Sequence, residues 1–207
     1  WASFSLLMLW AYPAVIAPLF NKFTQLENEQ LQQRIQTLLD RCGFKSKGIY
    51  VMDGSRRSGH GNAYFTGMGQ NKRIVFFDTL LETLEPDEIE AVLAHELGHF
   101  KRKHVQKRIV IMMLSSLAGL ALLGWLIDQS WFYQGLGVEQ GSNALALLLF
   151  LMVTPVFTLF LQPLSSWFSR KHEFEADDYA AKQSSAADLI RALVKMYKEN
   201  ASTLTPD

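Results

Sequence analysis

The chain has little cysteine and no net charge. Cys42 is the single cysteine among 207 residues, so no disulfide can form within the chain, and a lone thiol fits a reducing compartment. Twenty basic residues balance twenty acidic residues, which gives no overall attraction to nucleic acid. The composition therefore excludes an internal disulfide framework and predicts no nucleic-acid partner.

Three stretches lack charged side chains altogether. Ile109 to Ile127 and Ala144 to Phe168 hold 19 and 25 uncharged residues. As helices rising about 1.5 Å per residue, both can cross a hydrocarbon core of about 30 Å, so we expect two membrane spans. Trp1 to Phe20 is also uncharged and lacks the basic start and cleavage site of a signal peptide. We expect this segment to be a span or part of one, in a chain that begins within a longer protein.

Basic residues are missing from one connecting segment. Asp128 to Asn143 contains no Lys or Arg, whereas basic residues flank the other ends of the predicted spans. By the positive-inside rule, this loop faces away from the cytoplasm. We therefore expect a multi-pass integral membrane protein with the lipid bilayer as a partner. Its predicted parts are a partial span at 1–20, a cytoplasmic region at 21–108, spans at 109–127 and 144–168, a non-cytoplasmic loop at 128–143, and a second cytoplasmic region at 169–207.

The predicted cytoplasmic region combines helices with a small sheet. Thr24 and Glu27 have the spacing of a capping box, and apolar residues then recur at helical spacing from Leu31 to Leu39, with Gly43 as a stop signal. Three runs with strand character follow, at Ile49 to Asp53, Asn62 to Met68 and Arg73 to Asp78. The expected fold class is mainly α: a polytopic α-helical membrane protein with a small antiparallel β-sheet in its cytoplasmic region.

A zinc-binding signature lies in the next helix, which we expect to begin at Pro86. In His95-Glu96-x-x-His99 the two histidines are four residues apart, so they project from one face of a helix and can share one Zn²⁺ ion. Glu96 falls on the same stripe, where a general base would reach a water on the metal. No proline separates the signature from Ile109, so we expect this helix to continue into the first of the two long spans.

A catalytic zinc needs a third protein ligand. His104 would point away from the two histidines if the helix continued, and it stands among basic residues that suggest a solvated or headgroup-facing position. Glu173 and Asp177, again four residues apart, return to the same side of the membrane after two crossings. One of them can ligate zinc while the other accepts the N–H of a ligating histidine, and spacing alone does not decide which. Ion pairs with Arg170 and Lys171 are a further interpretation of these carboxylates.

Together these motifs resemble the type I CAAX prenyl endopeptidases, integral-membrane zinc metalloproteases. The resemblance rests on three stretches in the same order, 62–65 with 71–81, 93–99, and 169–177. It implies that Glu173 is the third zinc ligand and that Asp177 supports a ligand. It also implies that the chain is a fragment, because family members have further membrane helices upstream and a His-Pro segment with an arginine downstream.

The resulting hypothesis is zinc-dependent endoproteolysis at a membrane, with one Zn²⁺ ion and Glu96 as general base. The resemblance implies removal of a C-terminal tripeptide from CAAX proteins, or quality control of membrane proteins. If Asn62, Ala63 and Tyr64 begin an edge strand, they would hold a peptide or protein substrate by backbone hydrogen bonds; an ordinary amphipathic strand is the alternative.

Two other functions stay open. One is a catalytically silent membrane scaffold or chaperone with structural zinc, and the other is a peptidase for soluble substrates that uses the spans as an anchor. A bacterial inner membrane is favoured over an endomembrane. The sequence does not decide whether substrates are prenylated, what the oligomeric state is, or what His104 and His172 do.

Overall fold

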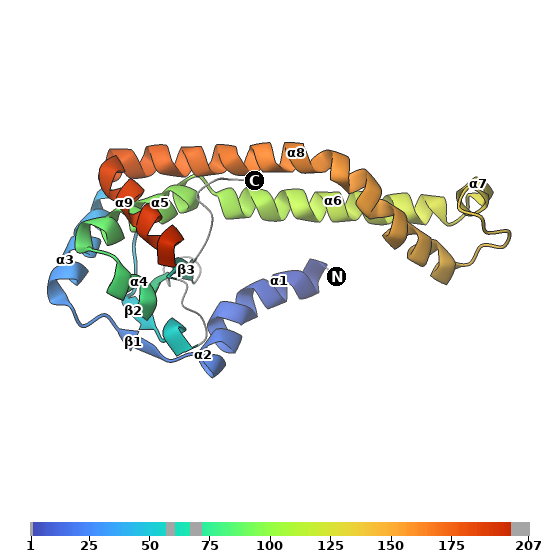
Figure 1. The fold of residues 1–207 in the computed structure, drawn as a ribbon. Helices are drawn as coiled ribbons and strands as arrows, with labels where there is room; N and C mark the ends of the chain where they lie inside the picture. The colour runs from blue at the N-terminus through green and yellow to red at the C-terminus, as the bar shows by residue number, and fades with distance from the viewer. Residues whose placement is uncertain (1, 57–60, 67–71, 200–207) are drawn as a thin grey trace. The chain divides into compact units, whose positions relative to one another are not determined.

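The computed structural model describes residues 2–56, 61–66 and 72–199. The chain divides into two compact units. We call Trp1–Arg102 with Phe174–Asp207 the mixed unit, because it holds the sheet, and Lys103–Glu173 the hairpin unit, because two long helices dominate it. The predicted mainly helical fold with a small sheet is confirmed (Figure 1).

The mixed unit begins with a helical segment in three pieces. Helix α1 covers Ala2–Ala11, a π-helical turn η1 covers Tyr12–Ile16, and α2 covers Ala17–Phe20. The side chain of Asn21 donates a hydrogen bond to the carbonyl of Ala17 at 2.8 Å and ends the helix. That this segment spans a membrane stays a prediction.

The sheet has four strands in the order β1-β2-β4-β3. They are β1 (Phe23–Gln25), β2 (Ile49–Met52), β3 (Ala63–Thr66) and β4 (Arg73–Phe77). The predicted sheet is present, but the expectation of wholly antiparallel pairing is wrong, because β2 and β4 run parallel. The chain leaves β2, forms β3, and re-enters the sheet between the two. Strand β1 was also missed: it contains Thr24, which does not cap a helix.

Helix α3 (Glu29–Arg41) begins one turn later than the capping box suggested. The side chain of Asn28 accepts the N–H of Leu31 at 3.0 Å and caps the helix. The predicted apolar face is confirmed, since Leu31, Ile35, Leu38 and Leu39 are all buried. Gly43 ends the helix with φ +64°, a conformation that glycine adopts without strain.

One face of the sheet supports the helix that carries the zinc signature. Alternate strand residues, Ile49, Ala63, Ile74 and Phe76, share a core with the apolar faces of α3 and α5 (Pro86–Lys101). Helix α5 packs against α3, β3 and α9 (Ala186–Glu199), and the short α4 (Asp78–Thr83) follows β4 directly. The zinc helix is therefore held in a globular core.

The expectation that the signature helix continues into a membrane helix is wrong. Helix α5 ends at Lys101, and α6 starts at His104. Between them Lys103 adopts a left-handed conformation with φ 58°, which costs a non-glycine residue about 1–2 kcal/mol. No glycine or proline marks this break, so helix propensity alone gave no signal. His104 consequently begins a different helix from the one that carries His95 and His99.

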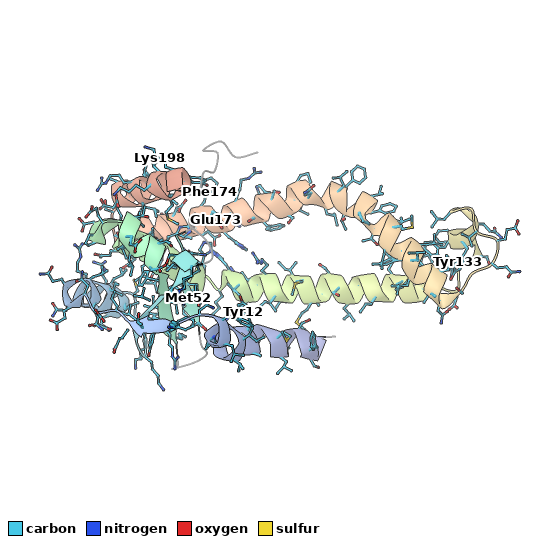
Figure 2. The ribbon with its side chains drawn as sticks, turned by 60° about the horizontal axis from the view of Figure 1, so that its bottom comes forward. Tyr12, Met52, Tyr133, Glu173, Phe174 and Lys198 are labelled. Atoms are coloured by element: carbon cyan, nitrogen blue, oxygen red, sulfur yellow. The ribbon has the colours of Figure 1, made fainter. Side chains whose placement is uncertain are left out.

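The hairpin unit consists of α6 (His104–Leu126), the short α7 (Ser130–Gln134) and the first part of α8 (Asn143–Gln183). At the loop end, a small apolar cluster of Leu126, Phe132, Tyr133, Ala146 and Leu149 joins the helices. At the other end, the rings of His104 and His172 stack with centroids 4.1 Å apart. Figure 2 labels Tyr133 and Glu173 at these opposite ends.

Both long helices are apolar enough to cross a membrane. In the described part of the chain, α6 and α8 meet this test, and only 6% of each apolar window is buried. The predicted span 144–168 falls inside α8, and the predicted span 109–127 lies in α6 except for Ile127, which follows its last residue; those exact bounds stay a prediction. Pro155 and Pro163 lie within α8, whose ribbon bends in its first half (Figure 1), as prolines inside a helix cause.

Candidate metal centre

The signature helix is fixed at its start by local capping. Pro86 occupies the first turn, and Glu85 and Glu88 form a reciprocal capping box in which the Glu88 side chain accepts the Glu85 N–H at 2.9 Å. The helix then runs unbroken through His95 and His99. These two histidines therefore lie one turn apart on one face, as predicted.

The two imidazoles converge through the same type of nitrogen. The Nε2 atoms of His95 and His99 are 3.1 Å apart, and the rings meet at 70°. Zinc–nitrogen bonds of about 2.0–2.1 Å in a tetrahedral site separate two ligand nitrogens by about 3.3 Å. The spacing of this pair therefore fits a shared zinc ion.

Asp177 fixes the orientation of one of these rings. Its Oδ1 atom lies 2.8 Å from Nδ1 of His95. A neutral His95 that donates its Nδ1–H to this carboxylate keeps the lone pair of Nε2 for a metal. The contact is the one that a supporting carboxylate would make, and this role of Asp177 stays a prediction.

Glu173 completes the group of potential ligands. It lies on α8, one turn before Asp177, and is labelled in Figure 2. One ligand atom from each of His95, His99 and Glu173 lies within 4.8 Å of the others, and the described residues contain no second group of this kind. Two neutral imidazoles and one carboxylate are a donor set that suits catalytic zinc.

Gly98 lets the carboxylate helix approach the histidine helix closely. A Cβ atom at this position would lie 2.9 Å from Cα and 3.0 Å from the carbonyl oxygen of Ala176, and 3.2 Å from Cβ of Tyr179. Burial, with the neighbouring thiol of Cys42, raises the pKa of Tyr179 to about 12. Sequence reasoning treated Gly98 as an unspecified motif position, although a glycine inside a helix was the signal of a close contact.

Glu96 lies on α5 between the two histidines and is half-buried. This position agrees with access from solvent, which a general base for hydrolysis requires. Its catalytic role stays a prediction.

The predicted substrate strand lies at an edge of the sheet. Strand β3 pairs with β4 on one side, and no strand pairs with its other side in the described part of the chain. The side chain of Asn62, just before β3, accepts the N–H of Ala63 at 2.8 Å. Tyr64 packs across the sheet on Phe77, and burial raises its pKa. The end of the predicted run, residues 67 and 68, lies outside the described residues.

An ion pair between a buried carboxylate and a partly exposed lysine, which sequence reasoning missed, connects the start of α5 to α9. Glu88 is 3% exposed and accepts a hydrogen bond from Nζ of Lys195 on α9 at 2.7 Å. Burial acts to raise the pKa of Glu88, but the hydrogen bonds from Lys195 and the Glu85 backbone outweigh it and lower the pKa below its ordinary value. Arg191 lies farther away, at 3.9 Å. No local motif connects these residues, because they are more than 100 positions apart.

His104 and His172 are not in the ligand group. Their stacked rings, inclined by 14°, instead join the two helices of the hairpin unit.

A helix with two convergent histidines, next to a helix that carries carboxylates, is typical of metallopeptidases. Comparison with known proteins is more specific. The sequence profile of Peptidase family M48 matches residues 25–204, and the chain belongs to this family.

The relatives that we compared are CAAX prenyl proteases. The chain is 39% identical to CAAX prenyl protease 1 of Saccharomyces cerevisiae over 94% of its length and 47% of that protein. It is 40% identical to the Arabidopsis thaliana homolog over 98% of its length and 48% of that protein. These matches confirm the predicted family.

A solved structure agrees. The crystal structure of S. mikatae Ste24p matches with a TM-score of 0.85 and 38% identity, over 99% of this chain and 51% of that one. The chain therefore spans about half the length of the relatives that it matches.

Proposed function

We propose that this chain forms the zinc-binding part of a membrane-integrated metalloendopeptidase. The observation that carries the proposal is the convergence of ligand atoms from His95, His99 and Glu173, with Asp177 bonded to the first of them. A scaffold or chaperone with structural zinc would be expected to close its site with a fourth protein ligand, and the ligand group supplies three.

Each residue has a distinct role in the proposed hydrolysis. A zinc ion, when bound, lowers the pKa of a coordinated water to about 7 and polarises the scissile carbonyl. His95, His99 and Glu173 hold this ion, and Asp177 keeps His95 in the tautomer that can bind it. Glu96 takes the proton of the attacking water and then gives a proton to the leaving amine.

The unpaired edge of β3 supplies a binding mode for the substrate. An extended peptide can add to such an edge through backbone hydrogen bonds, which would present one peptide bond to the metal helix that β3 contacts. By similarity to CAAX prenyl protease 1, the proposed reaction is removal of the C-terminal tripeptide from CAAX proteins, prenylated or not. Quality control of membrane proteins is a second use of the same chemistry.

The bilayer is the proposed setting. Apolar side chains of α6 and α8 face outward over most of their length, and this surface suits lipid better than water. A peptidase for soluble substrates with these helices as a simple anchor is disfavoured, because α8 itself carries Glu173 and Asp177. The cytoplasmic orientation, the preference for a bacterial inner membrane and the oligomeric state stay predictions.

The test is zinc-dependent cleavage of a CAAX peptide in two forms, with and without a prenyl group. The chain is compared with a longer version that includes flanking segments. Glu96→Gln should keep stoichiometric zinc and lose hydrolysis, whereas Glu139→Gln, an exposed loop carboxylate, should change neither. Full hydrolysis by the Glu96→Gln variant would refute the general-base role, and zinc binding without hydrolysis in every version would favour the silent scaffold.

A further inference from the structure

The lysines and arginines of the hairpin unit gather at one of its two ends, where Glu173 also lies, and its other two acidic residues lie at the loop end. All its basic residues lie near the end where the chain enters and leaves, and they are Lys103, Lys107, Arg108, Arg170 and Lys171. The loop end carries Asp128 and Glu139 and no basic residue. Between the ends, α6 and α8 have no charged residue from Ile109 to Ile127 and from Ala144 to Phe168.

The structure brings the five cations to one place. Lys103 and Lys171 are each next in sequence to a histidine of the stacked pair, whose ring centroids are 4.1 Å apart. Lys107 and Arg108 follow within the first two turns of α6, and Arg170 precedes Lys171 on α8. The two basic segments are therefore neighbours in space, although more than 60 positions separate them in sequence.

These cations are exposed, and no carboxylate of the described residues forms an ion pair with them. All five side chains are exposed, and the structure records no ion pair for any of them among residues 2–56, 61–66 and 72–199. Five like charges this close repel one another, so an external anion would stabilise them.

Aromatic side chains indicate the depth of this cluster relative to a bilayer. Trp167 and Phe168, half-exposed, lie on α8 just before the basic segment, and the ammonium group of Lys171 is 5.9 Å from the Trp167 ring. Trp125 and Trp131 occupy the loop end. Tryptophan at both ends of an apolar segment is typical of the two membrane–water interfaces. The cations therefore lie level with the lipid headgroups.

We propose that Lys103, Lys107, Arg108, Arg170 and Lys171 form a docking surface for anionic phospholipid headgroups. The inference rests on the membrane setting of the proposed function and not on its chemistry. The ligand is the phosphate of a lipid such as phosphatidylglycerol, held by charge and by the level at which the surface meets the bilayer. A headgroup without net charge, such as phosphatidylcholine, has no comparable attraction.

The test measures lipid preference in nanodiscs that contain phosphatidylcholine with about one-third phosphatidylglycerol. The full chain should retain phosphatidylglycerol over phosphatidylcholine when the lipids that remain bound after extraction are quantified. The variant Lys107→Gln, Arg108→Gln, Arg170→Gln should reduce this preference by about fivefold per charge removed. The matched variant Lys45→Gln, Lys47→Gln, Lys198→Gln removes three exposed charges from the mixed unit and should leave the preference unchanged.

Three results would overturn the proposal. They are no preference in the unmodified chain, equal loss in both triple variants, or displacement of the lipid by millimolar inorganic phosphate, which would indicate a site for free phosphate. If the first triple variant fails to fold, the unmodified chain is measured at increasing salt concentration. Its preference for phosphatidylglycerol should fall as salt screens the charges. A preference that does not depend on salt refutes the inference. The Glu96→Gln variant should show the same lipid preference as the unmodified chain. The lipid result therefore does not depend on whether the peptidase proposal is correct.

Discussion

The leucines of α3 in the mixed unit are buried, whereas most leucines of α6 and α8 in the hairpin unit are exposed. Leu38 and Leu39 of α3 are 0% exposed, but Leu117 of α6 and Leu159 of α8 are 64% and 61% exposed. The mixed unit follows the packing rules of a protein in water, with an amphipathic α3 and a sheet face as its core. The hairpin unit follows the rules of a bilayer, where helices satisfy their own backbone and lipid covers the side chains.

This contrast shows which residues of the candidate metal centre follow the packing rules of a protein in water. The paired histidines and Asp177 belong to the mixed unit, so water-based rules for capping, burial and hydrogen bonding apply to them. Glu173 is the last residue of the hairpin unit and lies on α8, four residues before Asp177. Four predictions test this comparison.

The largest effect is expected at the turn of α8 where the units join. Glu173→Ala removes a proposed ligand, so zinc should fall below one ion per chain and hydrolysis should be lost. Asp177→Ala leaves all three ligands and should weaken zinc binding by about 10–100-fold. Zinc content and competition with a chelator measure both. Asp178→Ala, which breaks an exposed pair with Lys182, is the control. If Asp177→Ala loses zinc and Glu173→Ala keeps it, the two roles are reversed.

The next effect compares one leucine from each unit. Leu38→Ala should lower the free energy of unfolding by about 2–5 kcal/mol, because it leaves a cavity in a fully buried site. Leu117→Ala, on an outward-facing position, should change it by less than about 1 kcal/mol. Denaturant unfolding in nanodiscs measures both. Equal losses would mean that Leu117 is packed against protein, and the contrast between the units would fail.

A glycine in each unit gives a smaller contrast. Gly98→Ala forces a Cβ atom against the backbone of Ala176, and we expect a loss of about 1–3 kcal/mol in stability together with weaker zinc binding. Gly119→Ala on α6 meets nothing within 4 Å and should be neutral or slightly stabilising, since alanine favours helix. Unchanged zinc affinity in the Gly98→Ala variant would show that the close approach does not position the ligands.

The smallest effect is a pH dependence in the mixed unit. The folded-state pKa of Glu88 is lowered below its ordinary value of 4.5, so its contribution to stability is present above that value and lost as pH falls through the folded pKa. Glu88→Gln should cost about 1 kcal/mol at neutral pH, and the difference from wild type should shrink below about pH 4.5. Urea unfolding across this range measures it, with the exposed Glu29→Gln as control. A difference that does not change with pH would contradict the assigned shift.

Local sequence patterns predicted most of the helices and strands. The pairing of the strands depends on long-range contacts, and local patterns did not predict it. Helix α3 and the signature helix α5 followed from apolar spacing and first-turn residues. Strand β1 was missed because three residues carry little signal, and the parallel pairing of β2 with β4 depends on how a distant segment returns. The break at Lys103 has no local cause, since lysine favours helix.

The site divides in the same way. The spacing of His95 and His99 was sufficient to predict their convergence, because helix geometry fixes it. Glu173 and Asp177 share one helix face, so spacing could not rank them. Their difference lies in which carboxylate reaches Nδ1 of His95, and that contact joins residues 82 positions apart. The pairing of Glu88 with Lys195 is long-range for the same reason.

The edge strand β3 carries a hazard as well as a binding surface. An open edge that accepts a peptide can also accept a strand from another copy of the protein, which is a route to aggregation. Here the strand is only four residues long, and its neighbour β4 begins at Arg73, preceded by Lys72. Alternate residues of an edge strand direct their backbone groups outward, so the same groups of β3 that would bind a peptide substrate are open to a strand of a second copy.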